Sequence, residues 1–484
     1  MKPITAGREE AAAGIARTAS IRWGLAGLAL SMLLPSLGTS IANVALPTLA
    51  QAFGAPFQAI QWVVLAYLLA ITTLIVGVGR LGDIAGRRRL LLAGIVVFSA
   101  ASVLCGAAPT LPLLIAARAA QGLGAAVMMA LSMAFVGETV PKERTGSAMG
   151  LLGTMSAIGT AIGPSLGGVL IAGLGWPAIF LLNVPLGVLA FVLARRYLSV
   201  DRRVPETGRG RFDLMGTLLL ALTLGAYALA MTIGRGDFGT LNIALLLAAA
   251  FGVGLFVRVE AKAASPLISL AMFRDPPLRA GLATSALVST VVMTTLVVGP
   301  FYLARALGLD PAGVGFVMSI GPAVVALTGV PAGRLTDRFG AQRVTLVGLV
   351  GMIGGCALLS ALPATLGIAG YVAPLVAVTG GYALFQTANN TGVMADVPQD
   401  RRGVLSGMLN LSRSLGLVTG ASVMGAVFAL ASGARDVAAA HPEAVAGAMR
   451  ITFAVAALLI VAALVLAVGV RRRPAQGLRK PTMS

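Results

Sequence analysis

Residues 79–89 read GRLGDIAGRRR, and residues 333–343 read GRLTDRFGAQR. The two stretches share Gly, Arg, Leu, Asp, Gly and Arg at matching positions, at an offset of 254 residues. A second pair of stretches, VPKERTGSAMG at 140–150 and VPQDRRGVLSG at 397–407, repeats at an offset of 257 residues. Two motifs that recur in the same order at nearly one offset indicate two homologous halves.

Long apolar runs flank these motifs. Of the 484 residues, 57% are hydrophobic and only 11% are charged, against about 25% charged in an ordinary soluble domain. This composition excludes a soluble enzyme, a disordered chain and a fibrous protein. Fourteen runs reach the length of roughly 20 apolar residues that crosses a bilayer as a helix. We therefore expect an all-α polytopic membrane protein with fourteen transmembrane helices.

The repeats fix the expected order of domains, because each copy falls after the second or the fourth helix of a six-helix set. Repeated halves of this kind are typical of secondary transporters. The expected segments are a cytoplasmic tail (1–22), an N-terminal six-helix bundle (23–194), a cytoplasmic linker (195–212), two inserted helices (213–259), a cytoplasmic loop (260–278), a C-terminal six-helix bundle (279–470) and a basic cytoplasmic tail (471–484).

The net charge of +19 lies in short basic runs between apolar segments, not on a face with interleaved aromatic residues. We interpret these basic runs as the positive charges that flank membrane helices on the cytoplasmic side, and we expect no nucleic-acid partner. Both termini are then cytoplasmic in a multi-pass protein of a bacterial inner (plasma) membrane.

The expected partners are the lipid bilayer and a small-molecule substrate, and we expect a monomer. No cluster of metal ligands, no catalytic constellation and no ATP-binding loop is present, so we expect no metal and no enzyme.

Both copies of the first motif combine glycines, an acid and arginines at a helix end. A basic cluster that only marks the end of a membrane helix would not explain why Gly, Asp, Gly and Arg recur. We therefore interpret the two copies as a cytoplasmic gate. The gate candidates are Gly79, Arg80, Asp83, Gly86, Arg87 and Arg88, and in the second copy Gly333, Arg334, Asp337, Arg338 and Gly340.

The gate motif resembles the loop between helices 2 and 3 of the major facilitator superfamily, and the resemblance covers roughly residues 22–470. Residues 118–124 (RAAQGLG) and 159–168 (GTAIGPSLGG) are similar to motifs of its fourteen-helix drug:proton antiporter branch. The matching residues are Arg118, Gln121 and Gly122 in helix 4, and Gly159, Gly163, Pro164, Gly167 and Gly168 in helix 5. The resemblance implies two six-helix bundles with two inserted helices, no bound cofactor, and export of small molecules driven by a proton gradient.

The sequence departs from this branch at Gly38, where the stretch LGTSIANVALP (37–47) lacks the usual helix-1 acid. Every Asp and Glu falls at a predicted helix end, in a loop or in a tail. A carboxyl group in the membrane is the usual proton carrier, because lipid raises its pKa toward neutrality. Without a carboxyl group inside the membrane, proton coupling stays an open question, and Asp213 or Glu138 could titrate at the cytoplasmic mouth instead. The missing acid also favours a neutral or anionic substrate.

Polar residues inside apolar runs are the candidates for a substrate cavity. Arg118 and Arg413 can either face a cavity or extend along the helix to the membrane surface. The other candidates can instead hydrogen-bond to neighbouring helices. These are Asn43, Gln61, Trp62, Tyr67, Gln386, Asn389 and Asn390.

The motifs together predict a secondary active transporter that exports small amphipathic molecules, such as drugs, biocides or metabolites, by alternating access. One alternative keeps the fold and drops the coupling, giving a facilitator or an importer of a neutral, hydroxylated or anionic solute. A second alternative is a transporter-like sensor or a lipid-handling protein.

Overall fold

The computed structural model describes residues 4–75, 77–140, 145–199, 213–233, 239–262, 275–394, 402–433 and 440–469. Within these ranges some side chains lie outside the described part, among them those of Arg80, Asp83 and Glu138. The described residues contain fourteen helical segments that are long and apolar enough to cross a membrane. The predicted number of transmembrane helices is therefore confirmed.

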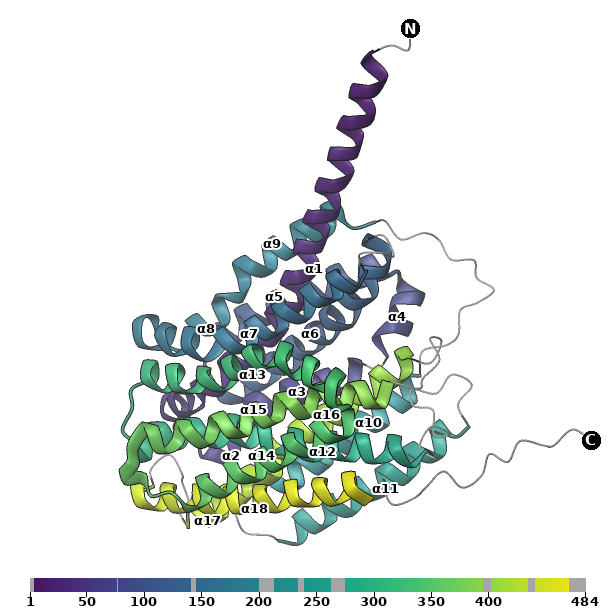
Figure 1. The fold of residues 1–484 in the computed structure, drawn as a ribbon. Helices are drawn as coiled ribbons and strands as arrows, with labels where there is room; N and C mark the ends of the chain where they lie inside the picture. Colours follow the sequence, from purple (N-terminus) through teal and green to yellow (C-terminus); the bar gives the residue numbers. More distant parts are fainter. Residues whose placement is uncertain are drawn as a thin grey trace, which may run out of the picture.

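The first six spans form the N-terminal half. They are α1 (Ile4–Phe53), α2 with α3 (Phe57–Ile60 and Trp62–Ile75), α5 (Arg87–Gly106), α6 (Leu111–Thr139), α7 (Thr145–Leu174) and α8 with α9 (Ala178–Leu181 and Asn183–Tyr197). A short helix, α4 (Val78–Ala85), joins α3 to α5. Helix α1 extends well beyond the bundle at its N-terminal end (Figure 1). The first helix thus begins before residue 23, where the N-terminal bundle was expected to start.

Two inserted spans follow, and then the six spans of the C-terminal half. The inserted spans are α10 (Leu214–Thr232) and α11 (Thr240–Glu260). The C-terminal spans are α12 with η4 (Pro276–Phe301 and Tyr302–Ala306), α13 (Pro311–Phe339), α14 (Ala341–Ala361), η5 with α15 (Ala364–Leu366 and Gly367–Met394), α16 with η6 and α17 (Arg402–Thr419, Gly420–Met424 and Gly425–Ala431) and α18 (Pro442–Gly469).

Local sequence signals explain several helix boundaries. The Asp213 carboxylate accepts a hydrogen bond from the Gly216 amide (2.8 Å) and caps α10, and Asp310 caps α13 in the same way (3.0 Å to the Gly313 amide). Such caps satisfy amide groups that have no partner inside the helix. Prolines within α1 and α7 do not end these helices, because neighbouring helices can satisfy the freed backbone groups.

The outer surface of the bundle is apolar. Large side chains such as Leu222, Phe251 and Leu327 are 69%, 73% and 79% exposed. In water such a surface would aggregate, whereas in a bilayer it is solvated by lipid chains. Polar side chains such as Arg118, Gln121 and Asn183 are instead fully buried inside the bundle. This inverted distribution fits a multi-pass membrane protein.

The two halves of the chain meet along two flanks. On the first flank α7 packs against α13, and on the second α3 packs against α16 with α10 beside them. The end of the bundle that carries the loops at Gly86 and Gly340 is called the motif end below, and the opposite end is called the far end.

Candidate functional site

The two gate loops have the same backbone geometry. Gly86, between α4 and α5, has φ 93°, and Gly340, between α13 and α14, has φ 84°. In both loops the glycine amide donates to the carbonyl oxygen four residues earlier, Gly82 or Thr336, at 2.9 Å. A positive φ of this kind is readily adopted only by glycine. The repeat seen in the sequence is thus also a repeat of local structure.

The arginines of the first gate loop extend toward the end of α9. The Arg88 guanidinium donates to the carbonyl oxygen of Arg195, a residue in the last turn of that helix. The Gly82 Cα packs close to Leu131 and Arg87, since a Cβ at Gly82 would lie 3.1 and 3.2 Å from their side-chain atoms. In the second copy of the motif, Arg334, Asp337 and Arg338 lie near the end of α13 and are exposed. The gate interactions predicted for Arg80 and Asp83 lie outside the described side chains.

Arg118 lies on α6 in the interior of the N-terminal half and is fully buried. Its Nε donates to the Val63 carbonyl on α3 at 2.8 Å, and Nη1 donates to the Gly38 carbonyl on α1 at 3.3 Å and to Oε1 of Gln121 at 2.6 Å. The Gln121 amide in turn donates to Ser102 Oγ on α5 at 2.7 Å. Arg118 and Gln121 together therefore connect four helices, α6, α3, α1 and α5.

The surroundings of Arg118 contain aromatic rings and neutral acceptors. Its guanidinium lies 4.1 Å from the centroid of the Tyr67 ring and 5.8 Å from that of Phe180. Nη2 is buried and has no hydrogen-bond partner. A buried charge held only by neutral groups is energetically costly, which makes Arg118 a candidate functional residue.

The glycines of helix 5 face two different neighbours. A Cβ at Gly159 would lie 2.6 Å from the Leu33 carbonyl oxygen, and one at Gly167 would lie 2.7 Å from Ile41, both on α1. Gly163 packs equally closely on Ser40, whose Oγ donates to the Gly159 carbonyl at 3.1 Å. These three glycines therefore bring α7 against α1 within the N-terminal half.

Gly168 faces the other half of the molecule. A Cβ there would collide with the Pro311 carbonyl of α13, and a Cβ at Gly315 would collide with the Pro164 carbonyl of α7. The Ser165 amide also donates to Ser319 Oγ at 2.8 Å. The motif thus joins α7 to both α1 and α13.

The C-terminal half repeats the α1–α7 packing, which the sequence reasoning missed. Gly416 and Gly420 pack against backbone carbonyls of α12, those of Ala286 and Thr290, and Thr290 Oγ1 donates to the Gly416 carbonyl at 3.1 Å. Both glycines lie 257 residues after Gly159 and Gly163. The offset of the second repeated motif would have located them.

Aromatic side chains seal the far end between the halves. Phe57 on α2 lies 4.7 Å from Phe301 and 5.6 Å from Phe428, measured between ring centroids. All three rings are fully buried. Gln61 packs directly against Gly425 of α17 in the same region. Nothing in the local sequence marked these phenylalanines, because they meet only when the halves come together.

A family model described as Major Facilitator Superfamily matches residues 28–421, which is most of the chain. The chain belongs to the major facilitator superfamily. It is 35% identical over 414 residues to the multidrug resistance protein Stp of Mycobacterium tuberculosis (strain CDC 1551 / Oshkosh), a match that covers 83% of this chain and 74% of the relative. It is 30% identical over 406 residues to the riboflavin transporter RibZ of Clostridioides difficile (strain 630), with 83% and 87% covered.

The fold of this chain is similar to that of a bacterial homologue of the human lysosomal transporter Spinster, which was solved in an inward-facing and occupied conformation. The TM-score is 0.68 at 16% identity, and the match covers 93% of this chain and 96% of that one. The architecture is therefore the major facilitator fold, with two six-helix bundles and two inserted helices. Membership of this family makes the protein a transporter and not an enzyme.

The remaining residues predicted to line a substrate cavity fall into two groups. Several make contacts inside or between helices: Asn43 donates to the Thr39 carbonyl at 3.0 Å, Trp62 to Thr232 Oγ1 at 3.0 Å, Tyr67 to the Pro35 carbonyl at 2.8 Å and Asn389 to the Gly281 carbonyl at 3.2 Å. Gln386 is half-buried, and Asn390 and Arg413 are exposed. The first group is held by neighbouring helices, and Gln386, Asn390 and Arg413 stay candidates for a substrate cavity.

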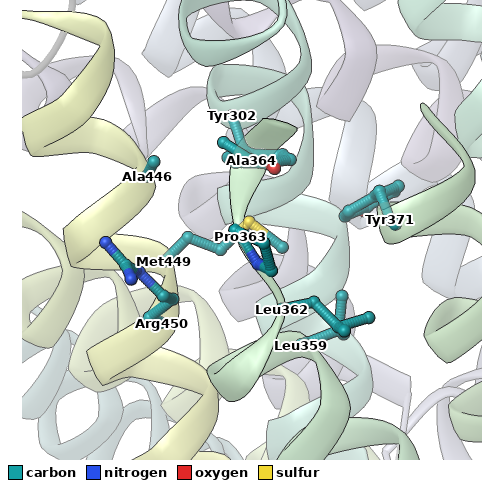
Figure 2. Close-up of a pocket in the computed structure, with 10 residues that line it drawn as sticks. Tyr302, Leu359, Leu362, Pro363, Ala364, Tyr371, Ala446, Met449 and Arg450 are labelled. Carbon is teal, nitrogen blue, oxygen red and sulfur yellow. The ribbon is translucent and has the colours of Figure 1, made fainter. Parts of the chain in front are cut away.

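A small hollow lies elsewhere, at the far end of the C-terminal half. Its walls come from η4, α14, η5, α15 and α18, with Tyr302, Tyr371 and Arg450 among the lining residues (Figure 2). The rings of Tyr302 and Tyr371 are 5.7 Å apart. The hollow lies within one half and not between the two halves. No group of three or more His, Cys, Asp or Glu residues that could bind a metal occurs among the described residues.

Proposed function

We propose that this transporter exports small amphipathic molecules by alternating access, coupled to proton entry. The observation that carries the proposal is that the two halves are closed against each other at the far end, while each half carries a copy of the gate loop at the motif end. At the far end the halves are sealed by Phe57, Phe301 and Phe428 and by the contact of Gly168 with Pro311. At the motif end, the two gate loops have matching geometry in the two halves.

The orientation follows from the distribution of charge. Arg87, Arg195, Arg258 and Arg334 all lie toward the motif end, and the positive-inside rule assigns such an end to the cytoplasm. The structure would then correspond to a state that is closed to the outside. Closure of the gate loops around Gly86 and Gly340 would accompany the opposite, outward-facing state.

The multidrug resistance protein Stp, among the relatives, supports export of drug-like molecules. The proton coupling has to be tested directly, since Gly38 replaces the acid of the antiporter branch and Arg118 is the charged group buried beside it. Coupling would then involve Asp213 at the start of α10, or Glu138, and not a carboxyl group at the middle of the membrane.

The experiment is dye export from proteoliposomes, with Hoechst 33342 and ethidium as probes, in the presence and absence of a pH gradient. Proton-driven export predicts that collapsing the gradient abolishes movement of both dyes, and that Arg118→Ala is inactive in either condition. Dye transport against its own concentration gradient that persists without a proton gradient would exclude antiport. Drug susceptibility of cells that express the same variants is the matching measurement in vivo.

A second function, uptake or facilitated passage of a neutral or anionic solute, is favoured by one relative and by the charges inside the membrane spans. The riboflavin transporter RibZ is 30% identical to this chain, and the spans described here contain a buried arginine, while Gly38 lacks a carboxylate. Transport of radiolabelled riboflavin into proteoliposomes, with the direction of net flux recorded, separates this function from drug export.

A further inference from the structure

Arg450 is a charged residue on the outer surface of α18. It is exposed, and so are Ala454 and Val461, which follow it along the helix. Residues four and eleven apart lie on one side of an α-helix, so these three side chains share one face. Because lipid chains cover such a surface in a bilayer, Arg450 lies where the surrounding solvent is lipid.

Arg450 also lies below the membrane surface at the far end. It follows the first residue of α18, Pro442, by eight positions, which places its backbone roughly 12 Å along the helix. The whole helix is about 42 Å long, so a hydrocarbon layer of about 30 Å centred on it leaves about 6 Å outside at each end. The backbone of Arg450 is then inside this layer, and its long side chain reaches the headgroup boundary. A charge at such a depth is costly unless it has a partner.

The described part of the chain supplies no partner for this charge. Within it, the Arg450 guanidinium makes no hydrogen bond and no ion pair. Glu443, the other charged residue of α18, is seven positions earlier and about two turns away, and these two side chains do not form an ion pair. A guanidinium has five N–H donors and no acceptor. An anion from outside the chain would therefore satisfy it.

Two tyrosines line the small hollow at the far end together with Arg450 (Figure 2). The Tyr302 hydroxyl is close enough to Arg450 for an electrostatic interaction, and it forms no hydrogen bond to another described residue. The Tyr371 hydroxyl lies 3.6 Å from the sulfur of Met318, which is a weak acceptor. No carboxylate is among the described residues that line the hollow. The hollow thus offers hydrogen-bond donors to an acceptor.

The size of the hollow limits what can enter it. Its free volume is about 10 Å³, at the lower limit of what one water molecule needs. Its remaining walls include the apolar side chains of Leu359, Leu362 and Met449. A drug-sized molecule needs a pocket of about 300 Å³ or more. Only a group of the size of one oxygen fits here, while the rest of its molecule stays at the edge of the bilayer.

The segment that carries Tyr302 is irregular. It is η4, a single π-helical turn that packs against α18. Such turns are rare and are frequently found at functional sites. Arg305 in the same turn adds a second positive charge, which also makes no ion pair within the described residues. Both arginines favour an anion at this end of the C-terminal half.

We propose that the hollow between η4, α15 and α18 binds the phosphate group of a phospholipid in the leaflet at the far end. The Arg450 guanidinium donates to two phosphate oxygens, a pairing for which its planar fork is suited. The Tyr302 hydroxyl donates to the oxygen that enters the hollow. The apolar walls contact the glycerol backbone and the first carbons of the acyl chains. This site is separate from the space between the halves, and it does not depend on the proposed export function.

Photo-crosslinking of the full-length protein in dodecyl maltoside, a detergent without phosphate, tests the site. The probes are a phosphatidylglycerol with a diazirine near the carboxyl end of one acyl chain, and a diacylglycerol with the same chains and no phosphate. Labelled peptides are identified by mass spectrometry. We expect the phosphatidylglycerol to label peptides that contain residues 359–371 and 446–450, and the diacylglycerol to label them at least tenfold less.

Three variants assign the binding to individual side chains. Arg450→Gln is expected to lower the labelling at a subsaturating lipid concentration about tenfold, because charge-assisted hydrogen bonds are lost. Tyr302→Phe, which keeps the ring and removes one donor, is expected to lower it less. Arg279→Gln removes an exposed arginine at the opposite end of α12 and is the matched control, with labelling equal to wild type. The melting temperature without lipid shows that each variant is folded.

The inference is overturned if the diacylglycerol labels the hollow as strongly as the phosphatidylglycerol, or if folded Arg450→Gln is labelled like wild type. An equal loss in Arg279→Gln would overturn it as well, since the lipid would then respond to net charge alone. Inorganic phosphate in millimolar excess should leave the labelling unchanged; displacement of the lipid would make a free anion the ligand and refute the proposal. None of these measurements involves transport, so a failure of this site and a failure of the proposed function are distinguishable.

Discussion

The guanidinium carbon of Arg118 lies over the ring of Tyr67, 4.1 Å from its centroid, with both side chains fully buried. A cation over an aromatic face is attracted by the ring quadrupole, and the attraction is strongest where water is excluded. The Tyr67 hydroxyl is in turn fixed by the Pro35 carbonyl of α1 at 2.8 Å. The pair therefore connects α6, α3 and α1 at the centre of the N-terminal half.

The first prediction concerns the charge of Arg118. Arg118→Ala removes the hydrogen bonds to Val63 and Gly38 and leaves a cavity in place of a fully buried side chain, and truncations of this kind cost about 2–5 kcal/mol. Arg118→Met fills the space without a charge and is expected to melt within a few degrees of wild type, since replacing a buried charge by an apolar side chain is often neutral. Thermal unfolding in detergent measures the first effect. If the charge has a role in transport, dye export is lost in both variants; export by the methionine variant would assign Arg118 to structure alone.

The second prediction concerns Gly38. A Cβ at this position would lie 3.6 Å from both Tyr67 Oη and Phe98, an ordinary contact distance, so a side chain can be added. Gly38→Asp places a carboxylate next to the guanidinium that donates to the Gly38 carbonyl. We expect higher thermal stability than wild type and a steeper dependence of export on pH. Gly38→Asn has the same shape without the charge, and equal behaviour of the two variants would contradict the prediction.

The third prediction concerns the contact between the halves. Gly168→Ala puts a methyl group against the Pro311 carbonyl, which is backbone and cannot move aside easily. Overpacking of this kind costs about 1–3 kcal/mol and acts only on the state in which the far end is closed. We expect the far end to open more often, measured as faster labelling of Phe57→Cys by a membrane-impermeant thiol reagent. Gly173→Ala on the same helix, with no atom within 4 Å, is the control and should behave as wild type.

The fourth prediction uses the two gate loops. Gly86→Ala and Gly340→Ala force a side chain into a backbone conformation with φ 93° and 84°, and such strain costs about 1–3 kcal/mol. Both variants should lower the melting temperature by similar amounts. Gly333→Ala, in the same motif but inside a helix with no atom within 4 Å, should be neutral or slightly stabilising. A large loss in Gly333→Ala would show that the motif depends on contacts of another state.

The fifth prediction concerns the bridge between α10 and the N-terminal half. Thr232→Val and Trp62→Phe each remove the hydrogen bond between Trp62 Nε1 and Thr232 Oγ1, worth about 0.5–1.5 kcal/mol. Because both changes remove the same bond, the double variant should lose less stability than the sum of the single variants. Thermal unfolding of the four proteins forms the cycle. Strict additivity would mean that the bond contributes nothing.

The sequence by itself determined the class of fold, the number of spans and the presence of two related halves. These properties are written along the chain, in runs of about 20 apolar residues and in two motifs that repeat at nearly one offset, and they need no knowledge of long-range contacts. Gly159, Gly163 and Gly167 are four residues apart, a spacing that places them on one face of a helix, and the structure packs that face against α1. Here local periodicity and tertiary packing agree.

Only the tertiary structure decided how the halves meet and what the polar residues contact. Arg118, considered for a cavity, is enclosed by Val63, Gly38 and Tyr67, and Trp62 binds Thr232 of the inserted helix. The seal of Phe57 on Phe301 and Phe428 was invisible in the sequence. In an apolar chain, every helix offers several faces that could be buried equally well. The choice between them depends on the fit of side chains that lie hundreds of residues apart, and only the folded molecule brings these side chains together.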